Sequence, residues 1–376
     1  MKKIVVAFDS FKGSLSSSEA SEAFIAGVKS VDPAVECCAV AIADGGEGMA
    51  EAIVGSVGGE MVSLYAHDPL GRNVEVRYGL INEGATAIIP ISSASGLTLL
   101  APEERNPLIA TTYGTGELIL DAVRRGCRRI IIGLGGSATN DGGVGLLRAL
   151  GYKFLDANGV ELTATIDILE CVDRVVAPES SPIAGVDISV AVDVDNPLCG
   201  EYGASYVYGS QKGASKDMIA RLDTAMRHYA DVVARWRGCD IADKAGMGAA
   251  GGAGFAFGAV LDAIPQSGIE LILNIVDFDN IIADAALVVT GEGRIDHQTV
   301  MGKAPAGVLR HAKSAGVCCV AVGGGVQWCD ELQKSEFDAI YAATPEGMPI
   351  AEAMKKEVAT ANLQRVATSI VKEFLS

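Results

Sequence analysis

The chain of 376 residues is 49% hydrophobic and 20% charged, which excludes a disordered chain and makes more than one domain the natural expectation. It has 30 basic and 47 acidic residues, for a formal net charge of −17. Nucleic acids and anionic membranes bind basic surfaces, so this charge argues against both as partners. An anionic small-molecule substrate is still compatible with it, because a few local lysines and arginines can neutralise such a ligand.

Cysteine usage and hydropathy are typical of a protein from a reducing compartment. The nine cysteines include no C-x-x-C and no zinc-ligand spacing. No apolar run approaches the roughly 18 residues of a membrane-spanning helix. The apolar run at the N-terminus meets Asp9 too early for a signal peptide. We therefore expect a soluble, cytoplasmic protein without membrane contact. The sequence does not determine the oligomeric state, and an oligomer is possible.

The first sixty residues contain one pattern twice. Lys3–Phe8 predicts a strand that runs into the polar loop Asp9–Ser14, and residues at helical spacing follow. Cys37–Ala43 predicts a second strand, which leads into the loop Asp44–Gly48 and a helix over Met49–Val57. Strands and helices that alternate in this way are typical of parallel βαβ units.

The middle of the chain has a different pattern. Two extended runs, Val74–Ile81 and Ala85–Ile91, are joined by residues 82–84 and predict an antiparallel hairpin. Ala245–Gly258 is almost all Gly and Ala, which suits close helix packing or a backbone that approaches a ligand. The other predicted elements are helices over Glu117–Arg125, Gly145–Leu150 and Lys216–Arg237, and strands over Arg129–Ile132 and Ile188–Val194.

The C-terminal part returns to the first pattern. Strands are predicted over Ala285–Thr290, Val317–Val322 and Ala339–Ala343, and helices over Ala304–Ala315 and Ile350–Leu375. Together these elements predict an α/β fold with two domains. A discontinuous parallel-sheet domain of the Rossmann or flavodoxin-like type would take residues 1–65 plus 284–376. A mixed-sheet α/β domain, 66–283, would be inserted into it, with the active site in the cleft between the two.

Polar side chains and glycines follow several strands of the predicted parallel sheet. In such sheets ligands bind outside the carboxyl ends of the strands. One loop of this kind is an ordinary turn, but three at one edge favour a site. The residues are Asp9, Ser10 and Lys12; Asp44 and Glu47; Glu292, Arg294 and Asp296; and Gly323–Gly325.

Glycines, carboxylates and a few cations together are typical of phosphoryl transfer with Mg²⁺. Backbone N–H groups cradle phosphates, carboxylates hold the metal and cations offset the developing charge. The candidate Mg²⁺ ligands are Asp44, Glu47, Glu292 and Asp296. No P-loop sequence and no protein-kinase signature occurs.

An alternative interpretation comes from Gly133–Ala138, which fits the G-x-G-x-x-A pattern of a dinucleotide site. Asp156 lies at about the distance that this pattern requires. However, Thr139–Gly143 postpones the helix that should begin at once. A glycine-rich loop that binds phosphate or substrate suits the same residues better.

Several long motifs resemble the bacterial glycerate kinase family, in order and over nearly the whole chain. They are Asp9–Ser14 (DSFKGS), Ala43–Gly48 (ADGGEG), Thr111–Glu117 (TTYGTGE), Gly135–Gly143 (GGSATNDGG), Asp193–Leu198 (DVDNPL), Gln211–Ala214 (QKGA), Thr290–Arg294 (TGEGR) and Gln298–Pro305. The resemblance implies two α/β domains and the ATP- and Mg²⁺-dependent phosphorylation of D-glycerate, with 2-phosphoglycerate the favoured product. A kinase for another small hydroxy acid, an NAD(P)-linked hydroxy-acid oxidoreductase and a non-catalytic sensor of sugar acids are the alternatives.

These motifs also supply the residues expected to bind substrate or nucleotide. They are Asp9, Ser10, Gly45, Gly46, Gly135, Gly136, Ser137, Asn140, Asp141, Lys212, Glu292 and Lys303.

The expected catalytic residues are Asp193, Lys12, Asp44 and Arg294. Asp193 ends a predicted strand, where it can accept the substrate's hydroxyl proton or equally cap a helix. Lys12 lies directly after a strand, as a phosphate or carboxylate ligand would. Arg294 can clamp the glycerate carboxylate or pair with a neighbouring acid.

Overall fold

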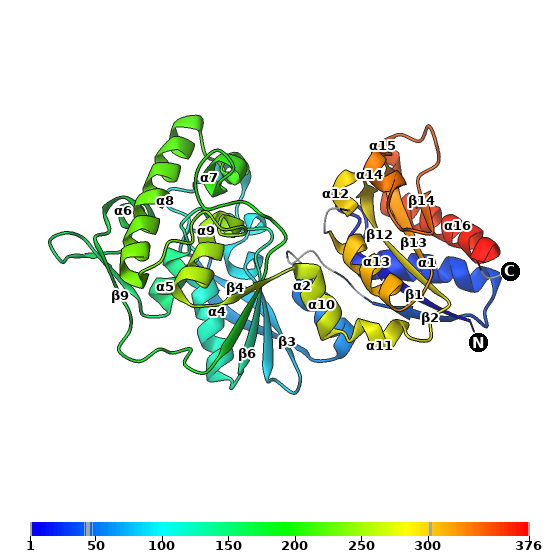
Figure 1. Cartoon of the computed structure of the whole chain (residues 1–376), viewed down its shortest axis with the longest axis horizontal. Helices are drawn as coiled ribbons and strands as arrows, with labels where there is room; N and C mark the ends of the chain where they lie inside the picture. Colours follow the sequence, from blue (N-terminus) through cyan, green and yellow to red (C-terminus); the bar gives the residue numbers. More distant parts are fainter. Residues whose placement is uncertain (1, 41, 43–45, 47, 301–302, 375–376) are drawn as a thin grey trace. The chain divides into compact units, whose positions relative to one another are not determined.

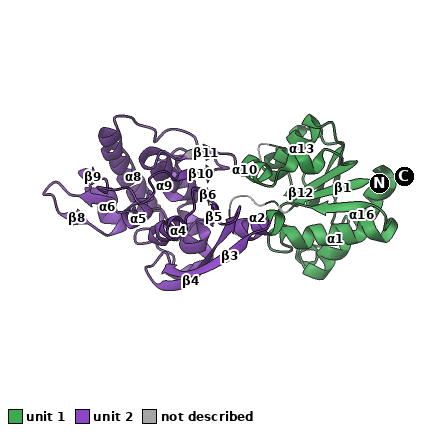
Figure 2. Cartoon of the chain, turned by 90° about the horizontal axis from the view of Figure 1, so that it is seen from below, with its two compact units in different colours: residues 1–44, 55–57, 269–376 green, residues 45–54, 58–268 purple. Residues whose placement is uncertain are grey.

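The computed structural model describes residues 2–40, 42, 46, 48–300 and 303–374 (Figure 1). The chain divides into two compact units (Figure 2). Unit 1 contains residues 1–44, 55–57 and 269–376, and unit 2 contains residues 45–54 and 58–268. Each unit has its own sheet.

Unit 1 is built on a parallel sheet of five strands. Their order across the sheet is β2-β1-β12-β13-β14, which is the flavodoxin-like order. The strands are β1 (Lys3–Phe8), β2 (Glu36–Ala39), β12 (Leu287–Ile295), β13 (Cys319–Val326) and β14 (Ala339–Ala342). The helices are α1 (Ser17–Val31), α10 (Gly268–Ile275), α11 (Phe278–Ile282), α12 (His297–Val300), α13 (Ala304–Ser314), α14 (Asp330–Gln333), α15 (Ile350–Ala353) and α16 (Lys356–Phe374).

Helices cover both faces of this sheet. Ile4, Val6 and Phe8 of β1 pack against α1 and α16 on one face, while Val5 and Ala7 pack against α10 and α13 on the other. A strand that is buried on both faces reads as a continuous apolar run, which is why the sequence revealed these strands.

Unit 2 contains a mixed sheet of six strands in the order β11-β10-β6-β5-β4-β3. The strands are β3 (Glu60–His67), β4 (Asn73–Ile81), β5 (Thr86–Pro90), β6 (Arg129–Gly133), β10 (Asp187–Ala191) and β11 (Ile264–Gln266). β5, β6, β10 and β11 are parallel, and β3 and β4 are antiparallel. The predicted hairpin is therefore confirmed as β4 and β5, and both predicted sheet types are confirmed.

A small antiparallel sheet and several helices complete unit 2. The small sheet consists of β7 (Lys153–Leu155), β8 (Glu161–Leu162) and β9 (Arg174–Val176). The helices are α2 (Met49–Val57), whose last turn is counted in unit 1, α3 (Ser92–Ser95), η1 (Leu97–Leu99), η2 (Pro102–Glu104), α4 (Tyr113–Arg124), α5 (Val144–Ala149), α6 (Thr165–Cys171), α7 (Ala204–Tyr208), η3 (Ser210–Lys212), α8 (Lys216–Arg237), α9 (Ala249–Phe255) and η4 (Ala256–Val260).

Some predicted boundaries differ from the observed ones. The helix predicted over Ile350–Leu375 is interrupted after Ala353, because Met354 and Lys355 form a turn before α16 begins. No Gly or Pro marks this turn in the sequence. The strand predicted over Ile188–Val194 ends at Ala191. The compact units divide at other residues than the predicted domains, because β3 pairs with β4 in unit 2 and α10 packs on the sheet of unit 1.

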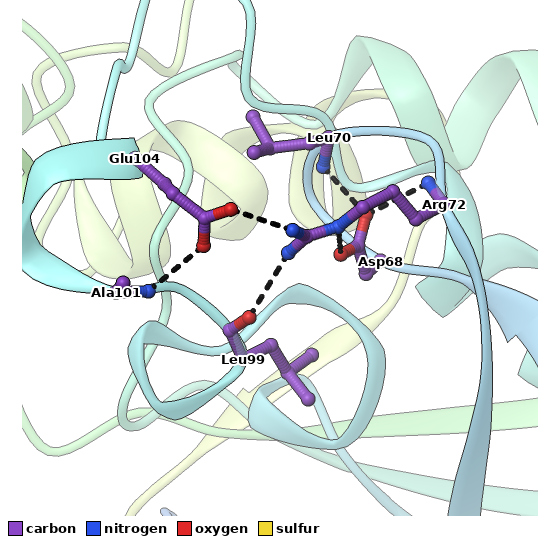
Figure 3. Close-up of polar contacts among 6 residues, drawn as sticks. All are labelled: Asp68, Leu70, Arg72, Leu99, Ala101 and Glu104. Atoms are coloured by element: carbon purple, nitrogen blue, oxygen red, sulfur yellow. Dashed lines mark hydrogen bonds and ion pairs between the residues drawn. The ribbon is translucent and has the colours of Figure 1, made fainter.

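Buried charges hold the loops of unit 2 in place. Asp68 accepts hydrogen bonds from Leu70 N, Arg72 N and Arg72 Nε, which close the turn between β3 and β4 (Figure 3). The same guanidinium donates to Glu104 Oε1 at 2.7 Å and to the Leu99 carbonyl, so the turn is tied to η1 and η2. Because Asp68 is buried, this charge-assisted bond is well shielded from water.

The Gly- and Ala-rich segment packs directly against the loop after β6. Gly251 and Gly252 have positive φ angles. A Cβ on Gly251 would lie 2.0 Å from the Thr139 carbonyl oxygen, and one on Gly252 would lie 2.8 Å from the Cα of Gly142. Gly142 N also donates to the Gly251 carbonyl at 2.9 Å. These small residues were predicted to pack against a helix or to approach a ligand, and at Gly251 and Gly252 they pack against the backbone of a loop.

Asp141 is the polar anchor of this loop. Its side chain is fully buried and accepts from Thr112 N, Thr112 Oγ1, Gly143 N and Gly145 N at 2.8 to 3.2 Å. Two of these donors lie at the start of α5, so the carboxylate also satisfies the free N–H groups of that helix end.

Replacing Asp141 by Asn should destabilise unit 2 by about 3 kcal/mol, because an amide NH₂ would face backbone donors. We would measure urea unfolding in a Trp328→Phe background, in which Trp236 on α8 is the single tryptophan and reports on unit 2. Asp167→Asn on the exposed side of α6 is the matched control. A free energy of unfolding within about 0.5 kcal/mol of the control would contradict this role.

Candidate active site

A cavity of about 640 Å³ opens in unit 1 at the carboxyl ends of β1, β12 and β13. Its polar lining includes Ser10, Lys12, Glu292, Arg294, Asp296 and Lys303. All six were predicted from sequence, and they come from two strand ends and the start of α13. β1 and β12 flank the point at which the strand order of the sheet reverses, where open α/β sheets bind their ligands.

The loop after β1 forms one wall of the cavity. Phe11 N donates to the Leu15 carbonyl and Leu15 N donates to the Phe11 carbonyl, so residues 11–15 make a tight turn. Gly13 has φ +77°, and a Cβ there would lie 2.8 Å from the Cε of Met354. The turn therefore requires glycine, and it places Lys12 at the cavity.

Glu292 and Lys303 form a partly buried ion pair on another wall. Glu292 Oε2 lies 3.7 Å from Lys303 Nζ, and Oε1 accepts from Thr299 Oγ1 at 2.7 Å. The Glu292 side chain is only 12% exposed, and burial raises the pKa of this carboxyl above its usual range, against the effects of Thr299 and Lys303. A cation that approaches the cavity would favour the ionised form.

Arg294 and Asp296 lie at the same end of β12. Arg294 Nε is 3.8 Å from Asp296 Oδ2, and its Nη2 donates to the side chain of Gln327. This loose pair matches the ordinary salt bridge that was the alternative to a substrate clamp. The guanidinium is two-thirds exposed, so it can still reach a ligand.

Glycines bring the backbones of this edge together. A Cβ on Gly324 would lie 2.5 Å from the Gly293 carbonyl oxygen, and one on Gly293 would lie 3.4 Å from Lys12 N. A larger residue at position 324 would therefore push β13 away from β12, whereas a Cβ at position 293 would be at ordinary contact distance from the loop after β1. Gly324 and Gly325 are themselves lining residues.

Other predicted residues of the first loops lie elsewhere or outside the described residues. Asp9 is buried, and its Oδ1 accepts from Ser10 N at 2.6 Å. Gly46 is also buried, and its carbonyl accepts from Met49 N. Neither lines the cavity. Asp44, Gly45 and Glu47 are not among the described residues.

The predicted residues of the middle segment form a second cluster, in unit 2. Gly136 is exposed and Gly135 half-buried, and this loop is held by Leu97 N, which donates to the Gly136 carbonyl. The first helix after β6 is α5, which begins only at Val144. The dinucleotide fingerprint, which needs a helix directly after its glycines, is therefore not met.

Lys212 holds this loop in place by hydrogen bonds from its buried side chain. It is almost fully buried, and Nζ donates to the Thr139 carbonyl at 2.6 Å and to Ser137 Oγ at 3.1 Å. Burial lowers the pKa of Lys212 to about 7, although the charge of Asp141 opposes that shift. Gly213 makes the fit tight, because a Cβ there would lie 2.2 Å from the Arg105 carbonyl oxygen.

Asn140, Asp141 and Lys212 were expected to contact a ligand, and in this conformation their side chains are buried. Asn140 Nδ2 donates to Ser205 Oγ at 2.8 Å, and the Asp141 carboxylate is occupied by its four internal donors. These residues position the loop, while Gly135 and Gly136 form its accessible part.

Asp193 lies just beyond β10. Its Oδ1 accepts from the backbone N–H of Gly268, the first residue of α10, at 2.7 Å. This is the capping geometry that the sequence left as an equal alternative to a catalytic base. The Asp193 side chain is exposed.

One set of cavity-lining residues was not predicted from the sequence. The cavity is also lined by Ile350 and Ala353 of α15, by Met354 in the following turn, and by Asn362 and Leu363 of α16, of which all but Asn362 are apolar. The sequence predicts an amphipathic helix here, but the side that faces a cavity and the side that faces a core look alike in a hydropathy pattern.

The described residues contain neither a grouped set of metal ligands nor a membrane-spanning helix. In that part of the chain no three His, Cys, Asp or Glu side chains are grouped as a metal site. Likewise, no helix of the described ranges has the length and apolarity to span a bilayer.

Comparisons with known proteins agree over the full length. Residues 4–375 match the model of the glycerate kinase family. Glycerate kinase of Bacillus subtilis is 42% identical over 98% of this chain and 96% of its own length. Glycerate 2-kinase of Escherichia coli is 43% identical over 86% of this chain and 85% of its own length.

The fold comparison gives the same result. The crystal structure of a protein described as glycerate kinase 2 from Salmonella typhimurium LT2 superposes with a TM-score of 0.86, at 39% identity, and covers 99% of this chain and 98% of that one. The family model, the full-length relatives and the shared fold thus agree with one assignment. This chain belongs to the glycerate kinase family.

Proposed function

We propose that this protein transfers the γ-phosphoryl group of ATP to a hydroxyl of D-glycerate, with 2-phosphoglycerate and ADP as products. The observation that carries the proposal is the cavity of unit 1, where six residues predicted for phosphoryl transfer line one space in a member of the glycerate kinase family. The 2-phosphate is favoured because the Escherichia coli relative is a glycerate 2-kinase.

The cations of the cavity suit a polyphosphate. Lys12, Arg294 and Lys303 approach it from three segments of the chain. Against the protein's net charge of −17, such a local group is needed to attract and hold an anion. Backbone N–H groups of the adjoining glycine loops can add hydrogen bonds to phosphate oxygens.

The carboxylates fit Mg²⁺. Glu292 and Asp296 both line the cavity, and Mg²⁺ in kinases is held by one or two carboxylates plus phosphate oxygens and water. When bound, the ion would neutralise charge on the transferred phosphoryl group. Asp44 and Glu47 are further proposed ligands from outside the described residues.

Unit 2 contributes the other proposed groups. Gly135, Gly136 and Ser137 form a loop that Lys212 and Asp141 hold rigid, and such a loop can bind small polar ligands through its backbone. Asp193 is the proposed general base for the glycerate hydroxyl.

The purified protein should release ADP from MgATP only when D-glycerate is present, and ³¹P NMR should identify 2-phosphoglycerate. A 3-phosphate would keep the kinase but reverse the orientation of the substrate. Absence of glycerate-dependent turnover by folded protein would contradict the proposed substrate.

Glu292→Gln should lower kcat/KM for MgATP by roughly 100-fold and raise the Mg²⁺ concentration needed for half-maximal rate. Because the pKa of Glu292 is raised, the wild type should lose MgATP affinity on acidification at a higher pH than an ordinary glutamate would dictate. A Mg²⁺ titration at several pH values measures both effects. The exposed Glu22→Gln on α1 is the control, and equal behaviour of the two variants would rule out a metal ligand.

Asp193→Asn separates the two roles of this residue. Asparagine can still accept from Gly268 N, so Tm should change little, whereas the proton acceptor is lost and kcat should fall by ~10²-fold or more. A variant with near wild-type kcat would leave Asp193 a helix cap alone.

A further inference from the structure

The lining of the cavity of unit 1 has two chemically different parts. One part carries the charged groups described above, together with Gly324 and Gly325. The other part, called here the apolar end, consists of Ile350, Ala353, Met354 and Leu363, and Met354 approaches Gly13 in the loop after β1. D-Glycerate is a three-carbon acid with polar groups on every carbon, so it has no use for an apolar wall. A cavity of about 640 Å³ is also far larger than that substrate, and lies in the range that holds a nucleotide.

Two of the apolar lining residues are unusually exposed. Ile350 is 77% exposed and Met354 41%. Trp328, which is 57% exposed, directly follows Gln327, a lining residue that pairs with Arg294. Large apolar side chains gathered on a surface mark a place where a ligand covers them. A flat heterocycle such as a purine matches this surface, because methionine and branched side chains pack well against aromatic faces.

A buried amide lies among these apolar residues. Asn362 is only 7% exposed, and it lines the cavity. Among the described residues its side chain makes one hydrogen bond, from Nδ2 to Met348 Sδ at 3.7 Å, which is a weak interaction. A buried amide normally has stronger partners, so a ligand that supplies both a donor and an acceptor would complete it.

We propose that the apolar end is the base-binding subsite for the nucleotide, and that Asn362 recognises adenine. Asn362 Oδ1 would accept from the exocyclic N6 amino group while Nδ2 donates to the adjacent ring nitrogen N1, so that the amide reads the N1 and N6 edge of the base. The phosphates would then extend toward Lys12, Lys303 and the glycine loops. The inference rests on the proposed function only in taking ATP as the nucleotide.

This pairing also determines which base is preferred. Guanine carries an oxygen in place of the amino group and a ring N–H in place of the acceptor, so Asn362 meets it with mismatched groups unless the amide turns over. An aspartate at this position would lose the donor that adenine needs and could accept from two guanine N–H groups instead.

The location of the subsite can be tested by fluorescence transfer. In a Trp236→Phe background Trp328 is the single tryptophan. N-methylanthraniloyl-ADP with Mg²⁺ should quench Trp328 and gain emission, and unlabelled ADP should reverse the signal while D-glycerate should not. Absence of transfer from bound labelled ADP, or its displacement by D-glycerate alone, would overturn the location.

The role of Asn362 can be tested by base preference. The ratio of the Kd for GDP to the Kd for ADP, measured by competition against the labelled nucleotide, should fall roughly 10-fold in Asn362→Asp, which corresponds to one lost base contact. Asn274→Asp, on the exposed side of α10, is the matched control and should leave the ratio unchanged. A ratio taken on one preparation does not depend on the folded fraction, so partial misfolding cannot imitate the effect.

These binding measurements do not require turnover. If the wild type binds ADP as expected but shows no glycerate-dependent ADP release, the substrate proposal fails and the base subsite stands. If glycerate turnover is normal but Asn362→Asp keeps the wild-type ratio, the assignment of Asn362 is overturned and the kinase stands.

Discussion

The parallel register of β1, β12 and β13 is the constraint on which the candidate site depends. Parallel strands end at the same edge of a sheet, so loops that are almost three hundred residues apart in the chain meet there. Because β1 and β12 are neighbours at the reversal of strand order, the helices that follow them lie on opposite faces and leave the edge open. Lys12, Glu292 and Arg294 reach one cavity for this reason. Their positions depend on hydrogen-bond register rather than on contacts among the side chains themselves.

Glycines allow the backbone segments at the carboxyl edge of the unit 1 sheet to approach one another closely. Gly324 lets the end of β13 approach the Gly293 backbone of β12, and Gly13 turns the loop after β1 beside Met354. The proposed anion site would thus be assembled without a P-loop, from several short segments in place of one loop. Such a site has fewer charges than its ligand, so we expect Mg²⁺ to supply part of the balance.

In unit 2, by contrast, buried polar side chains hold the glycine-rich loop after β6 in place. Asp141 satisfies four donors, Lys212 donates to Thr139 and Ser137, and the small residues of α9 press against the loop backbone. Each of these groups is costly to bury alone and is stable only with its partners present. A loop of glycines has little rigidity of its own, and the buried charges of Asp141 and Lys212 supply it in this conformation.

The sequence by itself determined the elements that are periodic or buried on both faces, the two sheet types and the motifs that show the family. α8, over Lys216–Arg237, matches its predicted bounds because one amphipathic pattern runs its full length between an N-cap serine and a C-terminal glycine. Only the tertiary structure decided which side chains line a cavity and which are enclosed by their neighbours. Asp141 and Asp296 are both aspartates in loops after strands, yet one is enclosed by backbone donors and the other lines a cavity. Only the tertiary structure likewise showed that α15 and α16 close the apolar end of that cavity, because local periodicity records that a face is apolar and not what covers it.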